Sequence, residues 1–213
     1  VLCIEMPIKQ ESGQASRAQN HIKWLEANFE NVSSITFCLD SVFDSFTQLA
    51  PETNNKKNQF LSLANTRARF RMTSLYYFAA LNRYLVTGTG NKVEDFGVGF
   101  YTKYGDGGVD ISPIADLMKT EVFQIASHLK IIKSIQKAAP TDGLWEDDRT
   151  DEDQLGATYP ELEWAMNAVK GLVSPNSFTE RQKIVFEIYL NHHSQNQHKM
   201  NPIPVCKIPE EFS

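Results

Sequence analysis

The chain has 213 residues, of which 41% are hydrophobic, so it can bury a core, and no shift of composition indicates a second domain. A net charge of −5 and the lack of a long apolar run argue against a broad nucleic-acid surface and against a membrane span. Its three cysteines lie far apart without metal-binding spacing, which argues against a disulfide framework or a zinc site and is typical of a reducing cytoplasm.

In the first half of the chain, strand patterns alternate with helix patterns. The predicted elements are a buried strand at Val1–Met6, a helix at Ser16–Phe29, a strand at Ser34–Leu39, a helix at Ser41–Leu49, a helix at Thr66–Tyr84 with Asn65 as its N-cap, and a strand at Tyr84–Thr89. This alternation predicts an α/β fold with a parallel sheet and right-handed crossovers. Ligands then bind beyond the carboxyl ends of the strands, which are Pro7 onward, Asp40 and the Gly88-Thr89-Gly90 turn.

The alternation fades in the second half of the chain. Helices are predicted at Ile114–Leu129, Tyr159–Val169 and Thr179–His193, with an irregular acidic stretch at Thr141–Asp153. That stretch contains Glu146, Asp147 and Asp148, and it is either a lid over the ligands or a plain solvated loop.

Several polar residues lie at or near the predicted ligand edge. Thr89 and Glu94 form a hydroxyl and carboxylate pair suited to a nucleotide and its Mg²⁺, although a turn followed by a surface carboxylate would have the same sequence. Helical spacing places Arg67 and Arg71 on one face and Arg69 on the other, so only one side can face the ligand edge. A solvated basic face is the alternative.

The loop from Thr102 to Asp110 contains three glycines around Asp106, with Lys103 and Asp110 at its two ends. It is either an Asp-Gly hairpin turn or a loop that approaches a nucleotide closely. Lys119 and Thr141 each have a simple structural explanation when taken alone. The histidines near the C-terminus indicate no transition metal, because an adjacent pair at a polar helix end is usually solvated.

Taken in chain order, these segments resemble the ammonia-dependent NAD synthetases over nearly the whole chain. The matching segments are Arg67-Ala68-Arg69-Phe70-Arg71-Met72, Gly88-Thr89-Gly90-Asn91-Lys92, the Thr102 to Asp110 loop, Ile111-Ser112-Pro113, Asp116-Leu117, Lys119-Thr120-Glu121-Val122, Ala139-Pro140-Thr141, Thr150-Asp151-Glu152-Asp153-Gln154-Leu155-Gly156 and His198-Lys199. No single segment is decisive, but chance would seldom produce so many in one order.

The resemblance implies a homodimeric enzyme with a Rossmann-like parallel sheet, of the ATP pyrophosphatase or adenine nucleotide alpha-hydrolase-like group, and the cysteine pattern predicts a cytoplasmic location. It implies that deamido-NAD, ATP and ammonia are converted into NAD, AMP and pyrophosphate through an adenylated intermediate. Mg²⁺ is the implied cofactor and ATP the co-substrate. Protein groups then act by positioning substrates and neutralising charge rather than by bonding covalently.

Roles carry over residue by residue from this resemblance. Three residues are implied as ATP contacts: Thr89, Lys119 and Thr141. Five are implied as deamido-NAD contacts: Arg69, Lys103, Asp110, His198 and Lys199. Glu94 is implied as the Mg²⁺ ligand, with Asp95 as second choice because the chain is one residue longer than many relatives between Glu94 and Lys103.

The sequence departs from the family in lacking a Ser-Gly-Gly-x-Asp-Ser phosphate loop. Together with the absent initiator methionine, this predicts that residues 1–213 form one NAD synthetase domain that is incomplete at its N-terminus. Three alternatives stay open at this stage. They are a glutamine-dependent synthetase with its glutaminase domain upstream, another adenylating amidotransferase of the GMP synthetase type, and a non-catalytic dinucleotide-binding or regulatory protein.

Overall fold

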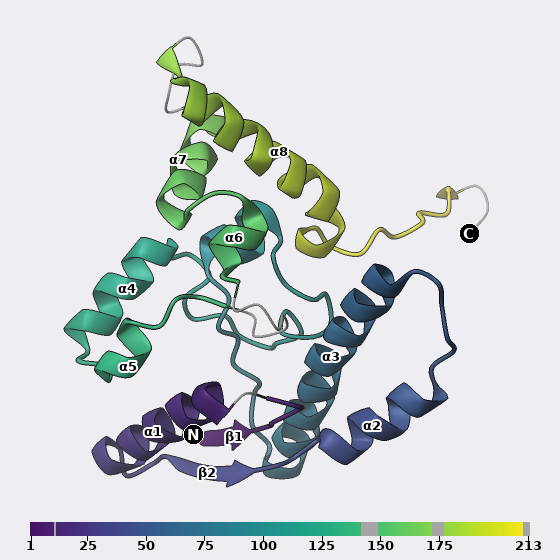
Figure 1. The fold of residues 1–213 in the computed structure, drawn as a ribbon, viewed down its shortest axis with the longest axis vertical. Coiled ribbons are helices and arrows are strands. Elements are labelled where there is room, and N and C mark those ends of the chain that lie inside the picture. The colour runs from purple at the N-terminus through teal and green to yellow at the C-terminus, as the bar shows by residue number, and fades with distance from the viewer. Residues whose placement is uncertain (11, 142–148, 172–176, 211–213) are drawn as a thin grey trace.

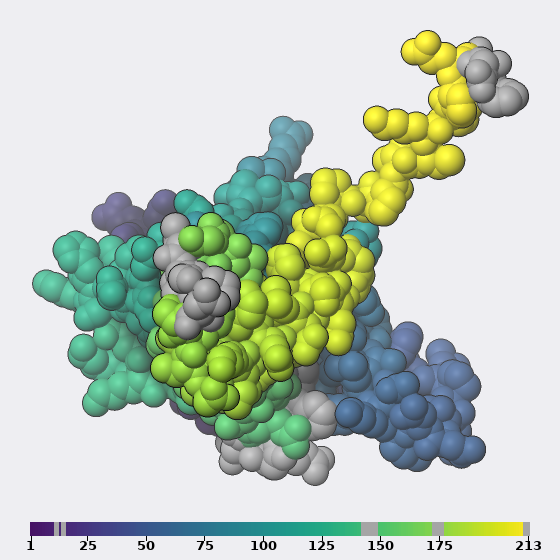
Figure 2. Space-filling view, turned by 90° about the horizontal axis from the view of Figure 1, so that it is seen from above, coloured from purple at the N-terminus to yellow at the C-terminus, as the bar shows by residue number. Residues whose placement is uncertain are grey.

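The computed structural model describes residues 1–10, 12–141, 149–171 and 177–210. The acidic residues Glu146, Asp147 and Asp148 lie outside the described residues. In Figure 1 the strands lie with helices α1 to α3 in the lower part of the molecule, and α6, α7 and α8 lie in the upper part. Figure 2 shows the segment after α8 projecting away from the body, and all of its described residues are exposed.

The chain begins with a strand, helix and strand unit, as the sequence predicts. Strands β1 (Leu2–Glu5) and β2 (Ser33–Thr36) pair in parallel, with Leu2 opposite Ser33 and Glu5 opposite Thr36. Helix α1 (Ser12–Asn28) connects them and begins four residues earlier than predicted. The second strand is shorter than the predicted Ser34–Leu39, although the N–H of Leu39 still donates to the carbonyl of Pro7 at 3.1 Å.

The predicted third strand, Tyr84–Thr89, is only partly correct. In the described part of the chain its pairing is reduced to one isolated parallel bridge between Thr87 and Ile111, with the N–H of Gly88 donating to the carbonyl of Ile111 at 2.7 Å. The Asp-Gly hairpin alternative is wrong, because the N–H of Asp110 donates to the carbonyl of Val86 at 2.9 Å. The parallel α/β arrangement is therefore confirmed, but the third strand contributes little regular structure.

Helix α3 (Lys56–Asn82) is ten residues longer at its start than the predicted helix. Its N-cap is Asn55, whose side chain accepts from the N–H of Asn58 at 3.1 Å, so the predicted cap at Asn65 is wrong. The polar first turn has the composition of a loop, and the apolar residues of α3 form no single stripe that would mark its start. Before it, α2 (Asp40–Leu49) begins one residue earlier than predicted.

The second half of the chain is helical. Its elements are η1, a π-helix (Lys92–Val98), then α4 (Lys119–His128), α5 (Lys133–Gln136), α6 (Asp151–Leu155), α7 (Tyr159–Val169) and α8 (Glu180–Met200). Helix α7 has the predicted bounds, α4 begins five residues later than predicted, and α8 ends seven residues later. Helix α6 lies where an irregular stretch was predicted, so that prediction is wrong for residues 151–153.

The buried core of this half lies where η1, α7 and α8 meet. Val93 and Val98 of η1 are fully buried, as is Leu162 of α7, and they pack with Val185 and Tyr189 of α8. Burial of such side chains contributes about 1.5–3 kcal/mol each to folding. Because η1 carries Glu94, this core also fixes the position of the predicted metal ligand.

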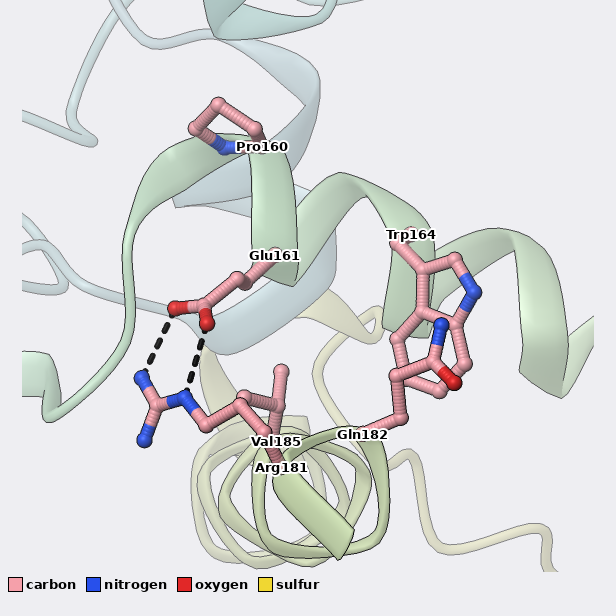
Figure 3. Close-up of a pocket in the computed structure, with 6 residues that line it drawn as sticks. All are labelled: Pro160, Glu161, Trp164, Arg181, Gln182 and Val185. Atoms are coloured by element: carbon pink, nitrogen blue, oxygen red, sulfur yellow. Dashed lines mark hydrogen bonds and ion pairs between the residues drawn. The ribbon is translucent and has the colours of Figure 1, made fainter. Parts of the chain in front are cut away.

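An open pocket of about 210 Å³ lies between the first turns of α7 and α8 and is shown in Figure 3. Trp164, Gln182 and Val185 contribute to its lining, together with a bidentate ion pair in which Arg181 donates to both oxygens of Glu161 at 2.7 Å each. None of the residues predicted to bind ligand lines this pocket.

The Glu161 carboxylate should stabilise the fold in a pH-dependent way. Hydrogen bonding from Arg181 lowers the pKa of Glu161 to about 2, from an ordinary value of 4.5. A pKa that is lower in the folded state stabilises the fold above about pH 4.5, and this stabilisation is lost as the pH falls toward 2. The pair is partly exposed and screened by solvent, so we expect Glu161→Gln to lower the melting temperature by about 2 °C at pH 7. The difference from the wild type should shrink at pH 2.5.

Glu180→Gln is the matched control, because Glu180 pairs with Lys183 on the same helix and its side chain is 89% exposed. We expect no measurable change of melting temperature for this control. A Glu161→Gln difference of equal size at pH 7 and pH 2.5 would show that the carboxylate charge does not stabilise the fold.

Candidate functional site

The Gly88-Thr89-Gly90 turn is tightly packed against its neighbours. A Cβ atom on Gly90 would lie 2.0 Å from the Asp95 carboxylate, and one on Gly88 would lie 2.9 Å from Val109, so a larger residue at either position would displace these side chains. Thr89 between them is exposed, which leaves it open to a ligand. The turn leads through Asn91 into η1 and so places Thr89 close in the chain to Glu94.

Asn91 sets the start of η1. It is buried, and its side-chain oxygen accepts from the N–H groups of Val93 and Glu94 at 3.1 Å each. An asparagine at a helix N-cap satisfies backbone donors that have no partner within the helix. This role is not evident from the sequence, although Asn91 stands directly after the glycine turn.

Glu94 lies in a cluster of charged and polar groups from four helices. Its Oε1 accepts from the ammonium of Lys119, at the start of α4, at 2.7 Å and from the hydroxyl of Tyr159, at the start of α7, at 2.6 Å. The Tyr159 hydroxyl also lies 3.2 Å from Oδ2 of Asp151 in α6. The structure thus brings together Glu94 and Lys119, one predicted for Mg²⁺ and the other for ATP, and both are largely buried.

The neighbours of Glu94 have shifted acidities. Removal from water, followed by the charges of Glu94 and Asp106, raises the pKa of Asp95 to about 6. Burial and the Glu94 carboxylate also raise the pKa of the Tyr159 hydroxyl, which therefore stays protonated and donates. Among the described residues, Lys119 forms the ion pair with Glu94.

Thr141, the third predicted ATP contact, lies just before the segment 142–148, which is outside the described residues. Its hydroxyl donates to the carbonyl of Arg149 at 3.1 Å. The preceding Pro140 accepts from the N–H of Asp151 at 3.0 Å, which connects the Thr141 segment to the start of α6 and through it to Tyr159. This connection of Thr141 to the Glu94 cluster is indirect.

Four of the five residues predicted to bind deamido-NAD gather where α3, the 99–105 segment and the end of α8 meet. Arg69 donates to the carbonyl of Lys103 at 3.3 Å, and the Lys103 ammonium donates to the carbonyl of His198. Lys199 donates to the carbonyls of Gly99 at 2.7 Å and of Tyr101 at 2.8 Å. In this structure these cations therefore bind backbone carbonyls of the chain itself.

Asp110, the fifth residue predicted to bind deamido-NAD, contacts parts of the fold instead. Its carboxylate accepts from the hydroxyl of Tyr76 at 3.0 Å and from the N–H of Val86 at 2.8 Å, which ties α3 to the start of the isolated bridge. The predicted split of the arginines is also visible. Arg71 donates to the carbonyl of Met6 at 3.1 Å, after β1, whereas Arg69 reaches Lys103 on the other side.

Among the described residues, no group of three or more His, Cys, Asp and Glu side chains is arranged to hold a metal ion. Mg²⁺ usually takes only one or two protein carboxylates and completes its octahedral shell with water and phosphate oxygens. The Glu94 carboxylate fits that requirement.

Within the described residues no helix is long and apolar enough to cross a membrane.

Two residues of this cluster were not assigned a role from the sequence. Asp151 was quoted only as part of a matching segment, and Tyr159 only as the start of a predicted helix. No local sequence pattern predicts that a tyrosine at the start of a helix contacts a residue 65 positions away. The segment Thr150 to Gly156, which resembles the family and lies just before Tyr159, was the sequence signal that could have indicated a role for this region.

A family model described as NAD synthase matches residues 1–203. The NH(3)-dependent NAD(+) synthetase of Carboxydothermus hydrogenoformans is 39% identical over 157 residues, which are 74% of this chain and 64% of that protein. The NH(3)-dependent NAD(+) synthetase of Methanosarcina mazei is 34% identical over 213 residues, which are 98% of this chain and 80% of that protein.

Among solved structures, NMN synthetase from Francisella tularensis superimposes with a TM-score of 0.78 and 28% sequence identity, covering 97% of this chain and 79% of that one. This likeness confirms the Rossmann-like, adenine nucleotide alpha-hydrolase-like fold that the sequence predicts. The family model covers most of the chain, and the Methanosarcina mazei relative aligns with nearly all of it. The chain therefore belongs to the NAD synthase family.

Proposed function

We propose that the protein amidates deamido-NAD with ammonia at the expense of ATP, giving NAD, AMP and pyrophosphate. The observation that carries this proposal is the contact between Glu94 and Lys119, within a chain of this family. A carboxylate and an ammonium side by side suit a triphosphate that arrives with Mg²⁺.

The reaction has two steps. An oxygen of the nicotinate carboxylate attacks the α-phosphorus of ATP and pyrophosphate leaves. The nitrogen of ammonia then attacks the activated carbonyl carbon, AMP leaves with the electrons of the broken bond, and a proton is released. No protein group bonds covalently to the substrates, so the residues act by holding them and by balancing charge.

Each predicted ATP contact has a role in this scheme. The Lys119 ammonium would turn from Glu94 toward phosphate oxygens, and the hydroxyls of Thr89 and Thr141 would hydrogen bond to the nucleotide. Glu94 would hold Mg²⁺, with Asp95 as second choice, and the ion would offset the charge of the triphosphate. The deamido-NAD group comprises Arg69, Lys103, Asp110, His198 and Lys199.

Lys103→Ala should weaken deamido-NAD binding by about tenfold and leave ATP binding within about twofold of the wild type. The Lys103 ammonium donates to the carbonyl of His198 and lies 5.5 Å from the centre of the Tyr104 ring, and among the described residues it forms no ion pair. It can therefore exchange the carbonyl bond for a substrate phosphate without breaking an ion pair. Michaelis constants for both substrates, measured with the other one saturating, provide the comparison.

Lys183→Ala is the control for this substitution, because Lys183 forms a surface ion pair with Glu180 away from the site. It should change neither Michaelis constant. An equal loss of affinity for both substrates in Lys103→Ala would contradict the assignment of Lys103 to deamido-NAD.

The activity itself is tested by incubating the protein with ATP, Mg²⁺, ammonia and one acceptor at a time. Deamido-NAD should give NAD and AMP in equal amounts. Because the chain is similar to an NMN synthetase, nicotinic acid mononucleotide is the second acceptor to test. If it is amidated faster than deamido-NAD, the proposed substrate would be the mononucleotide. Xanthosine monophosphate tests the GMP synthetase alternative, and binding without turnover would favour a regulatory protein.

Further parts of the proposal concern the assembly. We propose a homodimer in the cytoplasm, and the exposed apolar side chains near the end of α3 support an interface, since Tyr77, Leu81 and Leu85 are each more than 60% exposed. That residues 1–213 form one domain completed by an upstream phosphate loop stays a prediction. Light scattering of the purified protein tests the dimer, and its intact mass tests the upstream segment.

A further inference from the structure

Tyr159 connects the candidate site to the core. It is the first residue of α7, it is 2% exposed, and its hydroxyl donates to Oε1 of Glu94 at 2.6 Å. Its own N–H donates to Glu152 at 2.7 Å, which fixes the start of the helix. The ring therefore presents its hydroxyl to Glu94 from a rigid element.

The two contacts of Glu94 go to the same oxygen. Lys119 and Tyr159 both donate to Oε1, and within the described residues no hydrogen bond is made to Oε2. If Glu94 holds Mg²⁺ through one oxygen, Oε2 is the oxygen left for it. The hydrogen bonds of a metal-ligating carboxylate orient it and thereby tune its affinity for the metal.

The two donors differ in what they can do once ATP binds. Lys119 has a long side chain and is needed for the phosphates, so it leaves Oε1 in the proposed complex. Tyr159 is buried and has no such freedom. Its hydroxyl remains as the donor that holds Oε1 after Lys119 has moved.

We propose that Tyr159 is a positioning residue that fixes Oε1 of Glu94 and so directs Oε2 toward the metal in the ATP complex. This inference rests on the proposed function, because it assumes that Glu94 meets Mg²⁺ at an ATP site. A residue of α7 would thus orient a carboxylate of η1.

The test is the affinity of the protein for Mn²⁺, measured by electron paramagnetic resonance in the presence of α,β-methylene-ATP. Loss of a group that orients a metal ligand costs about 10–100-fold in metal affinity, so we expect Tyr159→Phe to weaken Mn²⁺ binding by about tenfold. With saturating Mg²⁺ and ATP, kcat should stay within about threefold of the wild type. Tyr189→Phe is the matched control and should leave Mn²⁺ affinity unchanged. Tyr189 is also buried in the core, and within the described residues no hydrogen bond joins its side chain to a residue predicted to bind ligand.

A double-mutant cycle separates positioning from a general structural effect. In a Glu94→Gln background, Tyr159→Phe should weaken Mn²⁺ binding no further, because the residue through which it acts is already altered. Replacement of Tyr159 by 4-aminophenylalanine, which keeps a donor at the same place, should restore the affinity. If Tyr159→Phe does not fold, 4-fluorophenylalanine fills the space of the hydroxyl without donating and takes its place.

The outcomes distinguish this inference from the proposal beneath it. A wild-type protein that binds no Mn²⁺ with the nucleotide would overturn the proposed function and this inference with it. Wild-type binding that is unchanged in Tyr159→Phe would overturn the positioning role alone. So would a tenfold loss that persists in the Glu94→Gln background.

Discussion

Gly99→Ala should destabilise the protein by about 3 kcal/mol, which corresponds to a fall of roughly 9 °C in melting temperature for a chain of this size. Gly99 ends η1 with a φ of 64°, in the left-handed region, where a side chain costs about 1–2 kcal/mol. A Cβ atom there would also lie 2.4 Å from the Cβ of Asn196 in α8. Overpacking of this kind adds about 1–3 kcal/mol, because a Cβ atom cannot turn away without moving the helix.

Gly156→Ala separates the two causes. Gly156 also has a positive φ, of 79°, but the nearest atom to an added Cβ is the end of Ile188 at 3.6 Å, an ordinary contact. We expect only the backbone cost of about 1 kcal/mol for this variant. Urea denaturation of both proteins gives the comparison, and equal losses would show that the packing of η1 against α8 adds nothing at Gly99.

Lys119→Gln should lower kcat/KM for ATP by about 10²–10³-fold, the loss that accompanies removal of one donor to a developing charge. The substitution also leaves the largely buried Glu94 carboxylate without its counter-charge, so we expect some loss of stability as well. Initial rates as a function of ATP concentration measure the first effect, and thermal denaturation measures the second.

Lys92→Gln provides the comparison for Lys119. Lys92 also pairs with a carboxylate, Asp116, but the Asp116 side chain is 96% exposed and the pair lies outside the predicted ATP contacts. We expect kcat/KM to stay within about twofold of the wild type. If Lys119→Gln retained wild-type kcat/KM while its stability fell, Lys119 would be a structural partner of Glu94 and not an ATP contact.

The sequence predicts those parts of the fold that depend on local patterns. The β1, α1 and β2 unit and the bounds of α7 follow from apolar spacing and from Pro7, which follows the first strand. The start of α3 was missed because its first turn is polar, and α6 because its acidic residues resemble a loop. The π-helix η1 depends on the buried Asn91 and on packing against α7 and α8, neither of which has a periodic signature.

For the site, the family resemblance predicts the residue set but not its internal contacts. Glu94 and Lys119 are 25 residues apart, and Lys103 and His198 are 95 apart, so no spacing rule pairs them. Tyr159 was missed for the same reason. Asp110 differs from these residues, because its contacts with Tyr76 and Val86 hold the fold together and join it to no other residue predicted to bind ligand.

The carbonyl contacts of Arg69, Lys103 and Lys199 have a consequence for selectivity. A small anion such as inorganic phosphate has a single charged group. It would have to displace the carbonyl contacts of several cations, and its few new hydrogen bonds would not compensate for those that are lost. In the proposed complex, deamido-NAD would offer two phosphates and two riboses at once, so several exchanges would occur within one binding event. If these cations bind the substrate as proposed, their carbonyl contacts would disfavour small anions and favour a ligand long enough to engage several cations together.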